Sequence, residues 1–273
     1  METGVNFKLP LRFVWGVLPV DNGDHLNPES LGKLVLDPEF DISQPESQEW
    51  LLKFCRHLHR QPFFQPTFGP LLPNCFIETF MKSMQRDCVD AFSSRDHSPC
   101  CRTSKFPYNS SVFYECIVEE MAQIYETPDQ YLIPGMAGPK FSKDQFPTIK
   151  AVIVEYDSSY SYSMSYEYMH DFFTKVENWM VEEMKSAPKT MQNGWFISEL
   201  EFYDLQRELS ENTILAIIVS MGLALIVLLL STLNILTSLY AILTITCSIF
   251  VTVAVLVLLG WKLNILESIT VST

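Results

Sequence analysis

The chain has 273 residues, enough for one or two domains with a buried core, and 48% of its residues are hydrophobic. Its 32 acidic and 19 basic residues give a formal net charge of −13. That excess of negative charge repels phosphate backbones and therefore argues against nucleic-acid binding. An acidic face could attract a basic partner protein, but the excess charge lies in residues 1–211, and we favour the simpler interpretation that it keeps this part of the chain soluble.

The N-terminal part of the chain begins with a predicted strand and a predicted helix. Residues 11–20, LRFVWGVLPV, are rich in β-branched and aromatic side chains and predict a strand, followed by a proline-containing loop over residues 21–47. Residues 47–60 carry apolar side chains at helical spacing. They predict a helix with Ser47 as its N-cap.

The next segment alternates between helices and proline-rich or serine-rich loops. Four prolines in residues 61–75 exclude a helix or a central strand there. Residues 76–92 and 113–125 return to helical spacing. Residues 93–110 between them predict a loop.

Cysteines gather in the same segment and indicate the redox compartment. The chain has seven cysteines, and six of them are Cys55, Cys75, Cys88, Cys100, Cys101 and Cys116. The chain has no C-x-x-C pair of the kind that binds zinc. We therefore predict three disulfides, in which the adjacent Cys100 and Cys101 pair with other cysteines rather than with each other. Asn109-Ser110-Ser111 is an N-glycosylation sequon. Together these features predict a lumenal or extracellular location.

Residues 148–211 predict a strand, a helix and a second strand. The strands are expected at 148–159 and 194–202, and the amphipathic helix at 166–187. This order indicates a split βαβ or ferredoxin-like half, and the strand at 11–20 could join the same sheet. We interpret the tyrosine- and serine-rich run before the helix as a loop.

No constellation of residues indicates catalysis or metal binding. His57 and His59 are two positions apart, which places them on different faces of a helix. The chain shows no Ser-His-Asp arrangement, glycine-rich phosphate loop or metalloprotease motif. We therefore expect no enzymatic activity and no bound cofactor.

The C-terminal part of the chain predicts membrane spans. Residues 212–261 contain no Asp, Glu, Lys, Arg or His. A bilayer-spanning helix needs roughly 20 apolar residues, and residues 213–233 and 235–260 each supply them, with STLN at 231–234 as the polar stretch where they meet. We predict an ectodomain over residues 1–211 and a membrane region over 212–273. Because the spans form a tight hairpin, STLN faces the side opposite the ectodomain.

Residues from 263 onward predict the start of a third span. Glu267 would lie close to the outer interface, where it is either a functional intramembrane group or a carboxylate that reaches interfacial water. The first residues, METGVNFKLP, lack the apolar core of a signal peptide. We therefore expect the chain to be an internal piece of a longer protein, with earlier spans before it.

Several long phrases of the chain resemble one family of membrane proteins. RFVWGVLPVDNGD, QEWLLKFCRHLHRQPFFQPTFGPLLPNCFIETF, PGMAGPKF and GWKLNILESITVS are similar to Dispatched proteins, members of the RND transporter superfamily and relatives of Patched. The resemblance covers nearly the whole chain and is greatest to the first vertebrate paralogue.

The resemblance implies twelve spans in two halves, each half with a large ectodomain. Proteins of this type release cholesterol-modified Hedgehog ligands and hand them to a secreted carrier, driven by a cation gradient thought to be sodium. By this resemblance the chain holds the second ectodomain, with residues 20–147 as a cysteine-rich insertion and 148–211 as the βαβ half, then spans eight, nine and early ten. It places the chain in the plasma membrane.

The resemblance does not carry over the ion-coupling residues. The family's acidic motif in span ten lies beyond the positions of this chain, and Glu267 comes too early in the span to match it. We therefore expect the chain alone to be inactive.

We also expect Phe202, Tyr203 and Leu205 to pack at the join between ectodomain and membrane region. Two alternatives remain. One is a Patched-like receptor for sterol or lipidated ligand, and the other is a receptor ectodomain without a transport role.

Overall fold

The computed structural model describes residues 7–24, 26–27, 29–30, 32–66, 75–90, 94–125, 137–142, 147–163 and 165–258. The chain divides into two compact units. The sheet unit comprises residues up to 162 together with 173–199, and the helical unit comprises residues 163–172 together with those from 200 onward.

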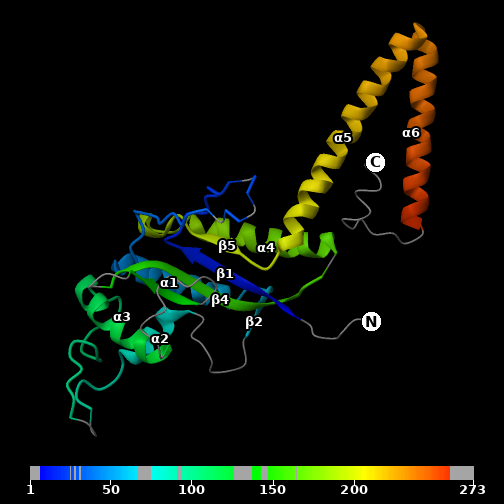
Figure 1. Cartoon of the computed structure of the whole chain (residues 1–273). Coiled ribbons are helices and arrows are strands. Elements are labelled where there is room, and N and C mark those ends of the chain that lie inside the picture. The colour runs from blue at the N-terminus through cyan, green and yellow to red at the C-terminus, as the bar shows by residue number, and fades with distance from the viewer. Residues whose placement is uncertain are drawn as a thin grey trace. The chain divides into compact units, whose positions relative to one another are not determined.

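A five-stranded sheet organises the sheet unit (Figure 1). Its strands are β1 (Lys8–Trp15), β2 (Phe64–Gln65), β3 (Gly138–Phe141), β4 (Ile149–Ser161) and β5 (Trp195–Ile197). β1 lies between β4 and β5 and is antiparallel to both, so β4 and β5 run parallel to each other. β2 and β3 pair with opposite ends of β4. The predicted strand–helix–strand unit is therefore split by the first strand of the chain.

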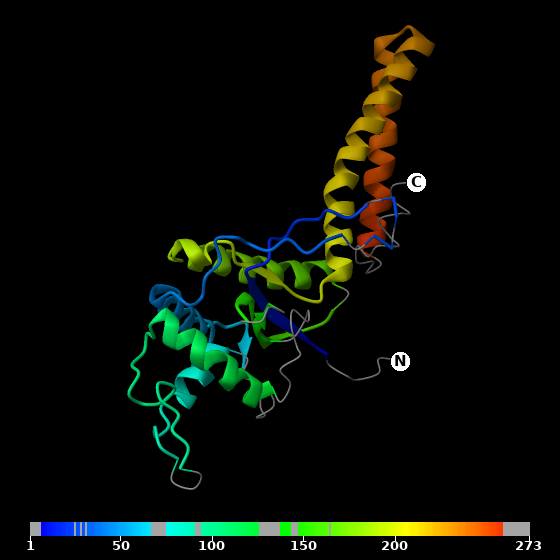
Figure 2. The ribbon, with the colours of Figure 1, turned by 60° about the vertical axis from the view of Figure 1, so that its left-hand side comes forward.

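Helices of the sheet unit gather around this sheet (Figures 1 and 2). They are α1 (Pro45–Leu58), α2 (Phe76–Ser83) and α3 (Ser110–Tyr125), with a short 3-10 helix at Lys189–Met191. The long helix α4 (Tyr166–Met184) links β4 to β5, and its first residues belong to the helical unit.

Aromatic packing on one face of the sheet forms the core of the sheet unit. β1 alternates so that Leu9, Leu11, Phe13 and Trp15 are each at most 1% exposed. The Phe13 ring lies 5.2 Å from the Phe54 ring of α1 and 5.6 Å from the Trp179 ring of α4. Because Phe54 and Trp179 also contact each other at 5.0 Å, α1 and α4 cover the same face of the sheet.

Two glycines make this packing possible. Gly16 ends β1 with a positive φ of 84°, and a Cβ at that position would collide with the backbone of Lys150. A Cβ on Gly194 would occupy the position of the Trp15 indole. The close approach of β1 to its neighbours therefore depends on glycine at both positions.

Two long apolar helices dominate the helical unit. They are α5 (Glu201–Thr232) and α6 (Ile235–Leu258), which form an antiparallel hairpin (Figure 2). Within them, Leu215–Thr232 and Ile235–Thr252 are long and apolar enough to cross a membrane. α5 runs without interruption through residues 211 and 212, so the predicted domain boundary falls inside one helix.

The structure corrects several predicted boundaries. The first strand covers Lys8–Trp15 rather than 11–20, because Gly16 turns the chain. Ser47 is not the N-cap of α1: the helix begins at Pro45, and the Ser47 hydroxyl lies 2.6 Å from the Thr190 hydroxyl.

Other boundaries differ in the second half of the sheet unit. The predicted helix over 76–92 ends at Ser83, because the chain then turns to pair Cys88 with Cys101. The predicted strand over 194–202 ends at Ile197, and residues 201 and 202 already belong to α5. The strand β3 was not predicted, and the run expected to be a loop before α4 belongs to β4 as far as Ser161.

Candidate functional site

A cluster of aromatic and charged side chains joins the start of α4 to the start of α5 within the helical unit. This cluster, which we call the tyrosine–histidine cluster, consists of Tyr166, His170, Tyr203 and Arg207. The Tyr166 ring stacks on the His170 ring at 5.4 Å and on the Tyr203 ring at 5.8 Å. Nδ1 of His170 and the hydroxyl of Tyr203 share a hydrogen bond of 2.8 Å. The cluster therefore fixes the first turns of the two helices to each other.

Tyr203 is the central member of this cluster. It is only 3% exposed, and the Arg207 guanidinium lies over its ring at 5.9 Å. Burial, and then the neighbouring Tyr166, raise the pKa of Tyr203. The hydroxyl is therefore protonated at neutral pH and is competent to hydrogen-bond His170 in either tautomer.

Of the three residues expected at this join, Tyr203 is the one shown to be packed. Leu205 is 48% exposed. Phe202 lies in α5, but its side chain is outside the described residues, as is all of Glu267. The partners Tyr166, His170 and Arg207 were missed, although Tyr166 and His170 stand at the i, i+4 spacing that brings side chains together on a helix.

A disulfide-bonded lobe of α1, α2 and α3 is the second notable region. The three disulfides are Cys55–Cys75, Cys88–Cys101 and Cys100–Cys116. They use all six clustered cysteines, and the adjacent Cys100 and Cys101 take different partners, as predicted. Cys247, in α6, is free.

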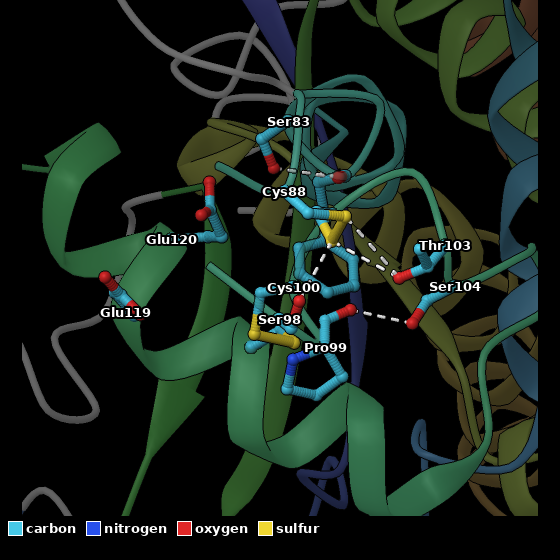
Figure 3. The surroundings of a disulfide bond; sticks show 12 residues. Ser83, Cys88, Ser98, Pro99, Cys100, Thr103, Ser104, Glu119 and Glu120 are labelled. Carbon is cyan, nitrogen blue, oxygen red and sulfur yellow. Dashed lines mark hydrogen bonds between the residues drawn. A yellow bond between two sulfur atoms is a disulfide. The ribbon is translucent and has the colours of Figure 1, made fainter. Parts of the chain in front are cut away.

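An ion pair lies beside these disulfides. The Glu120 carboxylate of α3 is 3% exposed and lies 2.5 Å from the Arg86 guanidinium. Nε of Arg86 also donates to the carbonyl of Cys100 at 2.8 Å. Glu119 and Glu120 point in different directions from α3 (Figure 3), and Glu119 pairs instead with the exposed Arg95 at 2.9 Å. The lobe thus couples one buried carboxylate to its covalent crosslinks, a feature without a signal in the sequence.

Charged residues also lie on the sheet face opposite the aromatic core. Arg12 pairs with Glu155 at 3.1 Å and with Glu199 at 3.2 Å. Lys140 on β3 is 4% exposed, and burial lowers its pKa to about 8 while Glu155 opposes that shift. Burial also raises the pKa of Glu155, which the Arg12 guanidinium counteracts. This arrangement resembles a structural charge network more than a reactive centre.

The histidines considered from the sequence lie apart, as expected. His57 contacts Glu183 at 3.2 Å, and His59 packs against Phe64 and Tyr156. Among the described residues, no group of three or more His, Cys, Asp or Glu side chains could hold a metal ion.

Comparison with known proteins shows what this chain is similar to. No protein-family model matches the chain. It is 43% identical to Protein dispatched of Drosophila melanogaster and 45% identical to Protein dispatched homolog 1 of Homo sapiens, in each case over 98% of its length. Over nearly its whole length, the chain is similar to one segment of Dispatched proteins. Identity to Protein dispatched homolog 2 of Mus musculus is 34%, so the first paralogue is the more similar, as the sequence suggested.

A solved structure shows the same similarity. The cryo-EM structure of the hedgehog release protein Disp from the water bear Hypsibius dujardini matches 97% of the chain with a TM-score of 0.59 and 28% identity. The chain spans 29% of that structure and 24% and 17% of the fly and human Dispatched relatives. The comparisons therefore concern one segment of a Dispatched-type protein.

The disulfide pairing predicts a simple peptide map. After proteolysis without reduction, Cys55 and Cys75 are expected in one linked pair, separate from a cluster that holds the other four cysteines. Cys100→Ser combined with Cys116→Ser should reduce that cluster to the Cys88–Cys101 pair. Mass spectrometry of the linked peptides tests both statements, and any crosslink from Cys55 or Cys75 into the cluster contradicts the pairing.

The Arg86–Glu120 ion pair predicts that the neighbouring carboxylates Glu119 and Glu120 contribute unequally to the free energy of unfolding. Glu120→Gln should lower the free energy of unfolding by about 2 kcal/mol, because it leaves the half-buried Arg86 without its charged partner. Glu119→Gln, the matched control, should change it by less than about 1 kcal/mol because its pair is exposed. Urea unfolding followed by tryptophan fluorescence measures both values, and equal effects would contradict this account.

The tyrosine–histidine cluster predicts a local effect of one hydroxyl group. Tyr203→Phe keeps the stacking on Tyr166 but removes the hydrogen bond to His170, which is worth about 1 kcal/mol. Backbone amides at the start of α5 should then exchange with solvent roughly fivefold faster. Hydrogen-exchange mass spectrometry tests this, with Tyr162→Phe as the control. Unchanged exchange in Tyr203→Phe would show that the hydroxyl does not hold the helices together.

Proposed function

We propose that the chain is part of a multi-pass RND-type transporter that releases cholesterol-modified Hedgehog ligand from the cells that produce it. The observation that carries this proposal is the match of nearly the whole chain to Dispatched sequences and to the water-bear hedgehog release protein. The proposed partners are lipid-modified Hedgehog, a secreted carrier protein, membrane lipid or sterol, and the remainder of the transporter.

In this proposal the sheet unit is a ferredoxin-like porter subdomain. Its topology supports this, because β4, α4 and β5 form a split βαβ unit around β1. The disulfide-bonded lobe is an insertion into that subdomain. Residues 1–211 would lie outside the cell at the plasma membrane, which the three disulfides support.

The two apolar helices are proposed as membrane spans. Many of their side chains, such as Leu215, Leu230 and Phe250, are exposed by more than 60% in the described structure. Large apolar side chains exposed along two whole helices suit lipid or other spans and do not suit water. A third span would begin near residue 263, with Glu267 in its first turns.

We assign no enzymatic step and no bound cofactor to these residues. The sodium gradient that the family resemblance implies would act through acidic groups elsewhere in the transporter. The tyrosine–histidine cluster has a mechanical role in this proposal: Tyr203 fixes α4 to the base of the first span. Movement of that span would then be transmitted to α4 through one buried side chain.

A chimera tests the proposal directly. The chimera is human Dispatched homolog 1 in which the matching segment is replaced by this chain. It would be expressed in cells that lack endogenous Dispatched. The chimera is expected to restore the appearance of lipid-modified Hedgehog in the medium, and the chain expressed alone is expected not to. A chimera that reaches the cell surface without restoring release would contradict the proposal. Release by the chain alone would show that it acts without the rest of the transporter.

A further inference from the structure

We propose that Asn109 carries an N-linked glycan. Asn109-Ser110-Ser111 is the only Asn-x-Ser/Thr sequon in the 273 residues, and the proposed transport function makes no use of it. The inference rests on the proposed extracellular position of residues 1–211, and it adds a modification site to that proposal.

The residue before the sequon is anchored in the protein interior. Tyr108 is 3% exposed, and its backbone is held by the side chain of Gln48, which is fully buried. Nε2 of Gln48 donates to the Tyr108 carbonyl at 2.9 Å, and the Tyr108 amide donates to Oε1 of Gln48 at 3.0 Å. With Tyr108 fixed inward on both backbone groups, the following residue, Asn109, is turned to the surface and is exposed.

The Asn109 atom that would receive the sugar is not engaged in a hydrogen bond with any of the described residues. The Ser111 amide donates to Oδ1 of Asn109 at 3.4 Å, which directs the side-chain oxygen toward the start of α3. Among the described residues, Nδ2 of Asn109 has no hydrogen-bond partner, and it is this nitrogen that receives the sugar. Ser111, the hydroxyl residue of the sequon, is also exposed. A glycan could therefore be attached without breaking an interaction of the fold.

The disulfides point independently to the compartment in which such modification occurs. The Cys100–Cys116 disulfide encloses Asn109 in its loop, so the sequon and the crosslink belong to the same lobe. Disulfides form and persist in oxidising compartments, and N-glycans are added along the same secretory route. The sequence motif, the exposed side chain and the redox environment therefore all support glycosylation of the same residue, Asn109.

The proposed step is a glycosyl transfer from a lipid-linked oligosaccharide diphosphate. Nδ2 of Asn109 forms a bond to the anomeric carbon of the sugar, and the bond between that carbon and the diphosphate oxygen breaks. The lipid diphosphate leaves with the bonding electrons, and Nδ2 loses one proton. No oxidation or reduction is involved. The bulky, hydrated product would keep partner proteins and lipid away from the start of α3.

The experiment uses the whole chain, directed to the secretory pathway of mammalian cells by an added signal peptide. Treatment with an amidase that removes N-glycans should increase its electrophoretic mobility by one step. Asn109→Gln and Ser111→Ala should abolish that shift. Ser111→Thr, which changes the same position but preserves the sequon, should retain it.

A second acceptor distinguishes failure of this site from failure of the proposed topology. A short Asn-Gly-Ser tag, placed between the signal peptide and residue 1 so that it does not depend on the fold, is combined with Ser111→Ala as a reporter of translocation. Glycosylation of the reporter, together with an unshifted parent chain, would overturn the Asn109 proposal and leave the extracellular placement intact. Absence of glycan from both would overturn the placement, and the Asn109 site with it.

Discussion

The sheet unit depends on the packing of two side chains of β1 against helices from distant parts of the sequence. Phe13 and Trp15 are fully buried and contact α1 through Phe54, and Phe13 contacts α4 through Trp179. Since β1 also lies between β4 and β5, it contributes both the hydrogen bonds at the centre of the sheet and the aromatic core on its face. Large aromatic side chains dominate the burial energy of a core, so this strand links β4, β5, α1 and α4.

The disulfide lobe and the tyrosine–histidine cluster are held together by interactions of different kinds. The lobe contains long connections between its helices, and covalent crosslinks reduce the number of conformations that these connections can adopt in the unfolded chain. The cluster holds only two helix starts together, by ring stacking and one hydrogen bond. Crosslinks suit a part that keeps its shape, whereas weak contacts suit a part that would move in the proposed transport cycle.

The sequence predicted those elements that a single local pattern is sufficient to define. Period and composition predicted the helices α1, α3 and α4, and the absence of charge predicted the two apolar helices. Local patterns could not show that β1 enters between β4 and β5, because strand order is decided by tertiary packing. Nor could they assign Ser47, which resembles an N-cap but bonds to Thr190, far away in the sequence. Of the residues expected at the join, Tyr203 could be named because it lies shortly before the apolar run in the sequence, while its partners on α4 required the fold.

The short connection between α5 and α6 has a consequence for how the chain could enter a bilayer. Thr232 bonds the Leu228 carbonyl at 2.7 Å and the Ser238 hydroxyl at 2.8 Å, and the Asn234 side chain accepts from the Leu236 amide at 3.1 Å. The polar groups at the tip are thus largely satisfied within the hairpin, and the tip carries no charge. Passing such a tip through hydrocarbon costs far less than passing a charged or unpaired loop. The two helices can therefore insert together from one side, as a single translocated element.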